Sequence, residues 1–119
     1  MRALSIAFCK IQGLRVWRQN CGKIVFIDKK TKKIRTFSAG PPKGAADLSG
    51  IYHGYRVEIE VKAPGKKRTQ EQEHWAKFVQ EHGGIYLLVT YDTSKSLKEN
   101  VCDSTETMRY VLHHHRYAP

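Results

Sequence analysis

Acidic side chains are scarce in this chain, which has 11 Asp and Glu against 21 Lys and Arg in 119 residues. No Asp or Glu occurs before Asp28, and the formal net charge is +10 with neutral histidines. In so small a protein, this excess of positive charge predicts a polyanionic partner, most simply a nucleic acid. The alternative is a basic surface whose charge only aids solubility.

Cysteines and long apolar runs are scarce as well. The three cysteines, Cys9, Cys21 and Cys102, have neither Cys-x-x-Cys nor Cys/His spacing, which argues against a structural zinc site. As free thiols they favour a reducing cytoplasm. No apolar run approaches the roughly 20 residues that span a bilayer, and Lys10 and Gln12 break the N-terminal segment too early for a signal peptide. We therefore expect a cytoplasmic protein with no membrane partner.

The remaining composition is that of a globular protein, 40% hydrophobic and 27% charged. The length predicts a single domain, residues 1–119, with a core of its own. Periodicity and turn residues predict helices at 2–12, from 69 and from near 103, and strands at 14–18, 23–28, 33–38, 46–52, 55–62 and 85–91. The last strand is the most apolar and is expected at the sheet centre. This order predicts an α/β fold, with a mixed β-sheet core flanked by helices.

Two of the helix starts carry a capping pattern. Thr69 and Gln72 have the spacing of an N-cap residue and its partner in the first turn, and Asp103 and Glu106 have the same spacing. We therefore place the starts of the second and third helices at these residues.

The strand at 55–62 carries charged side chains at every second position. Because successive side chains of a strand point to opposite faces, its charged row and its apolar row lie on different faces of the sheet. The charged row is Glu58, Glu60 and Lys62, and the apolar row is Val57, Ile59 and Val61. The apolar row predicts a core face. The charged row is either a solvated sheet face or a site.

A turn at His53 and Gly54 pairs this strand with the preceding one. Counted outward from the turn, Asp47 lies opposite 60–62, where cross-strand Cβ atoms are about 5 Å apart. Adjacent carboxylates resist joint ionisation, and a Mg²⁺ ion, which takes oxygen ligands, removes that repulsion. Such a metal activates a water and neutralises charge on a phosphate, and a lysine beside it holds the water or stabilises the oxyanion. Asp47, Glu60 and Lys62 therefore predict phosphodiester hydrolysis, although a Glu-x-Lys triplet is also common on a solvated strand.

A longer pattern surrounds these three residues. The segment 41–89, PPKGAADLSGIYHGYRVEIEVKAPGKKRTQEQEHWAKFVQEHGGIYLLV, resembles a VRR-NUC domain, the virus-type replication-repair nuclease family of the PD-(D/E)xK nuclease superfamily. The stretch 16–22, VWRQNCG, resembles the segment after that family's first helix. The positions that match in order and spacing are Gly44, Asp47, Glu60, Lys62, Gly65, Gln72, Trp75, Gly83 and Gly84.

The resemblance implies a restriction-endonuclease-like fold and a Mg²⁺- or Mn²⁺-dependent DNA endonuclease. Asp47 and Glu60 would be metal ligands, with the Val61 carbonyl as a third. Lys62 would position the attacking water or stabilise charge, and Gln72 would orient that lysine or the scissile phosphate. Gln72 has a second interpretation as the capping partner of Thr69, and the two roles are compatible only if its side chain swings away from the cap.

Other charged and aromatic residues have two interpretations each. Glu58 is either an auxiliary ligand or, more simply, a solvated or lysine-paired residue. The hairpin lysines and Arg35 either bind phosphate or form a solvated tip, and Trp17 and Trp75 are expected in the core. The residues expected to contact nucleic acid are Arg18, Lys43, Lys66, Lys67 and Arg68.

The chain departs from the family at its first helix, where members often carry an acidic ligand. Either the chain begins after that residue, or Gln12 or Asn20 replaces it, or the site binds metal with fewer charges. The family also implies branched or four-way-junction DNA as substrate, a bacterial or phage-infected cell, and a homodimer, since paired cuts need two active sites. The alternatives are a catalytically silent nucleic-acid-binding module and a ribonucleoprotein component.

Overall fold

The computed structural model of the chain describes residues 1–19, 22–39 and 41–117. Three helices and six strands lie in these residues. In chain order they are α1 (Arg2–Phe8), β1 (Leu14–Arg18), β2 (Gly22–Ile27), β3 (Ile34–Ala39), β4 (Leu48–Tyr52), β5 (Tyr55–Lys62), α2 (Gln70–Glu81), β6 (Ile85–Thr90) and α3 (Leu97–Tyr117).

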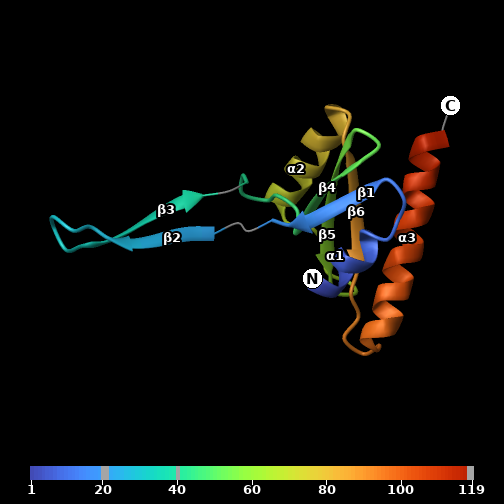
Figure 1. Cartoon of the computed structure of the whole chain (residues 1–119), viewed down its shortest axis with the longest axis horizontal. Helices are drawn as coiled ribbons and strands as arrows, with labels where there is room; N and C mark the ends of the chain where they lie inside the picture. Colours follow the sequence, from blue (N-terminus) through green and yellow to red (C-terminus); the bar gives the residue numbers. More distant parts are fainter. Residues whose placement is uncertain (20–21, 40, 118–119) are drawn as a thin grey trace.

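The body of the protein is a four-stranded mixed sheet in the order β1-β4-β5-β6. The β1–β4 and β4–β5 pairs are antiparallel, and β5–β6 is parallel. Helix α2 covers one face, and α1 and α3 cover the other (Figure 1). The predicted α/β fold with a mixed sheet flanked by helices is therefore confirmed.

Strand β6 lies at the edge of this sheet, so its expected place at the centre is wrong. Its apolar sequence has another cause, because β6 packs against α2 on one face and α3 on the other. A strand covered on both faces is apolar wherever it lies in the strand order.

The main core fills the space between the sheet and the helices α1 and α3. Of the apolar row of β5, Val57 and Ile59 are fully buried there and Val61 is partly buried against the same core, on the face that the alternation predicted. They pack with Leu4, Phe8, Leu48, Leu87, Met108 and Leu112 among others. A smaller cluster of Ala46, Ala76, Val79 and Tyr86 lies under α2, with Trp75 packed against it. The charged row of β5 therefore faces α2.

The ends of the helices differ in how well the sequence predicted them. Thr69 caps α2 in a complete capping box with Gln72, as expected. Helix α3 begins at Leu97 rather than near Asp103, because Ser96 Oγ accepts a hydrogen bond from the Glu99 backbone N–H at 3.1 Å. Ser96 and Glu99 thus have the same capping spacing about two turns before Asp103 and Glu106. None of the helices in the described part of the chain is both long and apolar enough to cross a bilayer.

Strands β2 and β3 form a separate two-stranded hairpin, as predicted, with Ile27 opposite Ile34. The hairpin stands out from the side of the sheet rather than packing on it (Figure 1). It accounts for the elongated shape of the molecule, which measures 57 × 35 × 27 Å along its principal axes.

Candidate functional site

The charged row of β5 is buried under α2. Glu58 is 1% exposed and Glu60 is 3% exposed, while Lys62 is half-buried. The solvated-face interpretation is therefore wrong for the two glutamates. Because an ionised carboxylate is costly to bury without partners, both side chains must be paired.

Asp47 is the first partner of Glu60. The antiparallel register sets Leu48 opposite Ile59, so Asp47, the residue just before β4, lies level with Glu60. Asp47 Oδ2 accepts a hydrogen bond from the backbone N–H of Val61 at 2.9 Å, which fixes the carboxylate at the end of β5. Counting from the hairpin turn therefore placed Asp47 correctly.

The proximity of the two carboxyl groups perturbs Glu60. Burial, a hydrogen bond with Asp47 and the Asp47 charge raise the pKa of Glu60 from 4.5 to about 8, and the Lys62 charge acts in the opposite direction. Oε2 of Glu60 is buried and accepts no hydrogen bond from the residues that the structure describes. At neutral pH this carboxyl therefore carries a proton unless a cation takes its place.

Gln72 holds the other oxygen of Glu60. Its Nε2 donates to Glu60 Oε1 at 3.1 Å, while its Oε1 accepts from the Thr69 backbone N–H at 2.9 Å. The expectation that the side chain must leave the cap to reach the site is wrong, because a carboxamide has separate donor and acceptor ends. The contact is made with Glu60, and no hydrogen bond to Lys62 accompanies it among the described residues.

Tyr86 belongs to this site, although the sequence interpretation did not include it. It lies opposite Glu58 in the parallel β5–β6 register, on the α2 face. Its hydroxyl is buried, and burial followed by the Glu60 charge raises the pKa of Tyr86 to about 12, while Arg68 acts in the opposite direction. The Arg68 guanidinium lies 5.4 Å from the centroid of its ring. The sequence carried no signal for this contact, since nothing in it sets the register of a parallel pair.

Both carboxylate oxygens of Glu58 have partners within the sheet. Ser49 Oγ donates to its Oε2 at 2.6 Å, and Arg56 binds its Oε1 at 3.2 Å. Gln19 Nε2 in turn donates to Ser49 Oγ at 2.6 Å. Glu58 is therefore neither solvated nor paired with a lysine, and these bonds leave it unsuited to be an auxiliary ligand.

The two tryptophans differ from expectation. Trp17 is 42% exposed rather than in the core, and its ring lies 5.7 Å from the Arg56 guanidinium carbon. Trp75 is half-buried against the small cluster under α2 and stacks on Phe78. The exposed Trp17 ring covers a charged side chain, which is a favourable use of an aromatic face.

Basic residues surround the edge where Asp47, Glu60 and Lys62 lie. Arg18 is exposed and pairs with Leu48, the neighbour of Asp47. Lys43 forms an exposed ion pair with Glu71 at 3.6 Å. Lys66 and Lys67 are exposed in the loop that joins β5 to α2, and Arg68 is half-buried at its end. All five predicted nucleic-acid contacts thus lie in segments that border the site.

Gln12 and Asn20 were the two residues expected to replace an acidic ligand in the first helix. Gln12 lies at the opposite end of the sheet, because it lines a cavity with Tyr52, which pairs with Leu14. It therefore cannot serve the site at Asp47. Asn20 lies outside the described residues. Gln19, which the sequence interpretation missed, donates its backbone N–H to the Asp47 carbonyl at 2.9 Å.

The acidic ligand set is small. Within residues 1–19, 22–39 and 41–117, no cluster of three or more His, Cys, Asp and Glu side chains is arranged to hold a metal. Asp47 and Glu60 are two carboxylates, to which the Val61 carbonyl would add a third oxygen. Such a set fits Mg²⁺ or Mn²⁺ better than softer metals, because these ions keep several waters and use one or two carboxylates. The unpartnered Oε2 of Glu60 is consistent with that fit.

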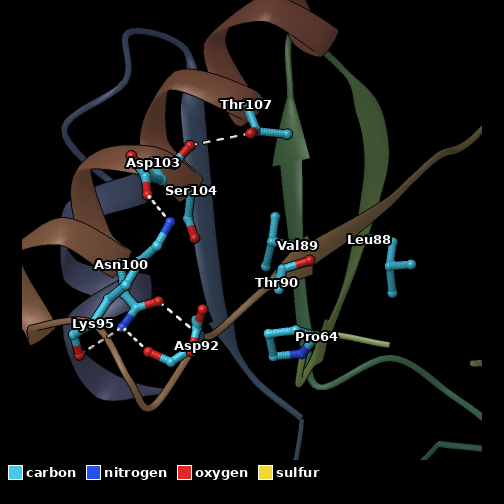
Figure 2. Close-up of a pocket in the computed structure, with 10 residues that line it drawn as sticks. All are labelled: Pro64, Leu88, Val89, Thr90, Asp92, Lys95, Asn100, Asp103, Ser104 and Thr107. Carbon is cyan, nitrogen blue, oxygen red and sulfur yellow. Dashed lines mark hydrogen bonds and ion pairs between the residues drawn. The ribbon is translucent and has the colours of Figure 1, made fainter. Parts of the chain in front are cut away.

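A cavity of about 410 Å³ lies elsewhere, between β6 and the start of α3 (Figure 2). Its polar side chains bind groups of the same lining residues: Asn100 Nδ2 donates to the Asp92 backbone carbonyl at 2.8 Å, and Lys95 pairs with the Asp103 carboxylate at 3.3 Å. These contacts hold the loop between β6 and α3. Neither Asp47, Glu60 nor Lys62 lines this cavity, so it is separate from the acidic pair.

No family model matches the chain, and none of the curated proteins matches it.

Proposed function

We propose that the protein is a Mg²⁺- or Mn²⁺-dependent DNA endonuclease that hydrolyses phosphodiester bonds at Asp47, Glu60 and Lys62. The observation that carries this proposal is the pairing of the buried Glu60 with the half-buried Asp47, where burial and the neighbouring carboxylate raise the pKa of Glu60 to about 8. Burying a carboxylate beside a second one costs stability, and a cation site is a physical reason to keep the pair. The Asp47–Glu60 pair also lies beside Lys62 and the basic loop 63–69, whose positive charges would bind the phosphates of a polyanionic substrate.

Each residue of the site has a role in this proposal. Asp47, Glu60 and the Val61 carbonyl would hold the cation, which when bound lowers the pKa of a water and neutralises charge on the phosphate. Lys62 holds the attacking water or stabilises the oxyanion with its ammonium group. Gln72 orients Glu60 through the 3.1 Å hydrogen bond, in place of the lysine or phosphate contact first expected. Arg18, Lys43, Lys66, Lys67 and Arg68 bind the DNA backbone.

Calorimetry with Mn²⁺ tests the cation site directly. Saturable binding is expected in the wild-type protein and is lost in Asp47→Asn and Glu60→Gln. The control variant Asp103→Asn removes an acidic residue of α3 whose side chain is exposed and binds Lys95, and it is expected to bind Mn²⁺ normally. Wild-type Mn²⁺ affinity in both site variants would refute the proposal.

The substrate follows from the resemblance and the charge. We propose branched or four-way-junction DNA, cut by a homodimer in the cytoplasm of a bacterial or phage-infected cell. Flaps, forks, nicked duplexes and four-way junctions incubated with Mg²⁺ or Mn²⁺ identify the preferred structure. Light scattering measures the mass, and a monomer that still makes symmetric paired cuts contradicts the dimer.

The second candidate is a nucleic-acid-binding module without catalysis. The small number of acidic ligands favours it, since only two carboxylates meet in the described site. DNA binding that persists without metal, together with no cleavage of any substrate in either metal, would support this alternative over the nuclease.

A further inference from the structure

The β2–β3 hairpin, residues Gly22–Ala39, forms an arm that stands away from the sheet (Figure 1). Its two strands pair only with each other among the described residues. The tip is nevertheless well defined, because the Asp28 carboxylate accepts the Lys30 backbone N–H at 2.9 Å and the Asp28 N–H donates to the Lys33 carbonyl at 2.9 Å. A well-defined turn on an arm whose strands pair with no other strand of the described residues indicates an element that contacts another molecule.

The tip of the arm is strongly basic. Asp28 is the only acidic residue of the arm, and it is neutralised by Arg35 at 3.1 Å. Lys29, Lys30, Lys32 and Lys33 are exposed, and in the described part of the chain none of them forms an ion pair. Four adjacent ammonium groups that the protein itself does not neutralise repel one another and favour a polyanion.

One face of the arm is apolar. Ile27 lies opposite Ile34 and Val25 lies opposite Thr36, which sets these side chains on the same face. Val25, Ile27 and Ile34 are 64%, 67% and 73% exposed. The area of these three side chains is small compared with the roughly 800 Å² that each partner buries in a stable protein interface. The charge of the tip, rather than this face, therefore decides the partner.

The base of the arm adjoins the acidic pair. The chain enters the arm after β1, where the Gln19 backbone N–H donates to the Asp47 carbonyl at 2.9 Å. It leaves the arm after β3 and returns to Asp47 at the start of β4. The arm therefore projects from the same end of the sheet that carries Asp47, Glu60 and Lys62.

We propose that the arm binds duplex DNA next to the cleavage site. A two-stranded β-ribbon fits the major groove, which is about 12 Å wide. The tip lysines contact phosphates, and the face of Val25, Ile27 and Ile34 lies toward the groove, where apolar side chains contact thymine methyl groups. The inference deepens the proposed nuclease function and rests on it for the substrate, but the binding itself requires no cleavage.

The salt dependence of DNA binding tests this arm. Affinity for a fluorescent duplex is measured by anisotropy in EDTA, where no cleavage occurs, between about 50 and 200 mM salt. In the triple variant Lys29→Gln, Lys30→Gln and Lys33→Gln, the slope of log K against log salt falls by about 2.7, which is about 0.9 for each lost phosphate contact. Lys32 is retained because its φ is +56°, and a substitution at this strained position could alter the turn as well as the charge.

A second triple variant removes the same charge elsewhere. Lys10→Gln, Lys98→Gln and Arg109→Gln alter exposed residues after α1 and on α3, across the sheet from α2. We expect this control to keep a slope within about one unit of the wild-type value, since it loses no phosphate contact. Circular dichroism and the melting temperature confirm that both variants are folded.

Two results would overturn the inference. Equal loss of slope in both triple variants would mean that only net charge matters. Unchanged DNA binding in the arm variant, with a dimer that falls to a monomer by light scattering, would make the arm a contact between copies. Failure of the nuclease proposal is separate, because it appears as absent cleavage in Mg²⁺ while the effect of the arm on binding in EDTA remains.

Discussion

Gln72 Nε2 donates a hydrogen bond to Glu60 Oε1 across 3.1 Å, while the same amide completes the capping box of α2. The start of the helix and the acidic site are thus one structural unit. Because α2 also buries Glu60, the residue that begins the helix orients the carboxylate that the helix covers. The consequences of this arrangement can be tested residue by residue.

Replacement of Gln72 by methionine should weaken cation binding. The change keeps the side-chain length but removes the donor to Glu60, and loss of such an orienting partner typically costs about 10- to 100-fold in metal affinity. Calorimetry with Mn²⁺ measures the effect. Thr69→Ala is the matched control, since it breaks the cap at a cost of about 1 kcal/mol without touching Glu60. Equal Mn²⁺ affinities in the two variants would remove Gln72 from the site.

Stability of the metal-free protein should fall as pH rises. The pKa of Glu60 is raised from 4.5 to about 8, so the folded state binds more protons than the unfolded state between those values. The free energy of unfolding therefore decreases with pH across that window and levels off above it. Thermal unfolding in EDTA across this range measures the trend. Glu60→Gln should remove most of this slope, and an unchanged slope would assign it to other groups.

Cation binding should show the opposite pH trend at the same residue. A cation must displace the proton of Glu60, so Mn²⁺ affinity rises as pH approaches the Glu60 pKa of about 8. Titration calorimetry in buffers with different ionisation enthalpies counts the protons released. No proton release near neutral pH would contradict a cation at Glu60.

Lys62→Met should separate chemistry from DNA binding. Loss of the ammonium group is expected to reduce the cleavage rate by about 10²–10³-fold, the scale for one stabilising group in a transition state. Affinity for DNA in EDTA should change little. Lys66→Ala, in the exposed loop, is the control and should weaken binding while leaving cleavage at saturating DNA intact. Wild-type cleavage by Lys62→Met would refute its role.

Glu58→Gln should act on stability alone. The carboxylate binds Ser49 and Arg56 within the sheet, and weakening these bonds at a buried position costs about 1–3 kcal/mol. Denaturant unfolding measures the loss. Because Glu58 is not proposed as a ligand, Mn²⁺ affinity should remain at the wild-type value, and a tenfold loss would restore Glu58 to the ligand set.

The sequence alone determined the local parts of this protein. Alternation in β5 predicted which residues face the core, the tight turn at His53 and Gly54 set the register that brings Asp47 to Glu60, and Thr69 with Gln72 marked the start of α2. These features depend on neighbours a few residues apart, where backbone geometry and hydrogen-bond spacing leave few alternatives.

Only the tertiary structure decided what the charged row becomes. The packing of α2 buries Glu58 and Glu60, and the parallel pairing with β6 brings Tyr86 to the same face. The sequence likewise did not predict that β6 lies at the sheet edge, that α3 begins earlier, or that the arm stands away from the sheet. The physical reason is that parallel register and helix packing join distant segments, whose contacts depend on the whole core rather than on any local pattern.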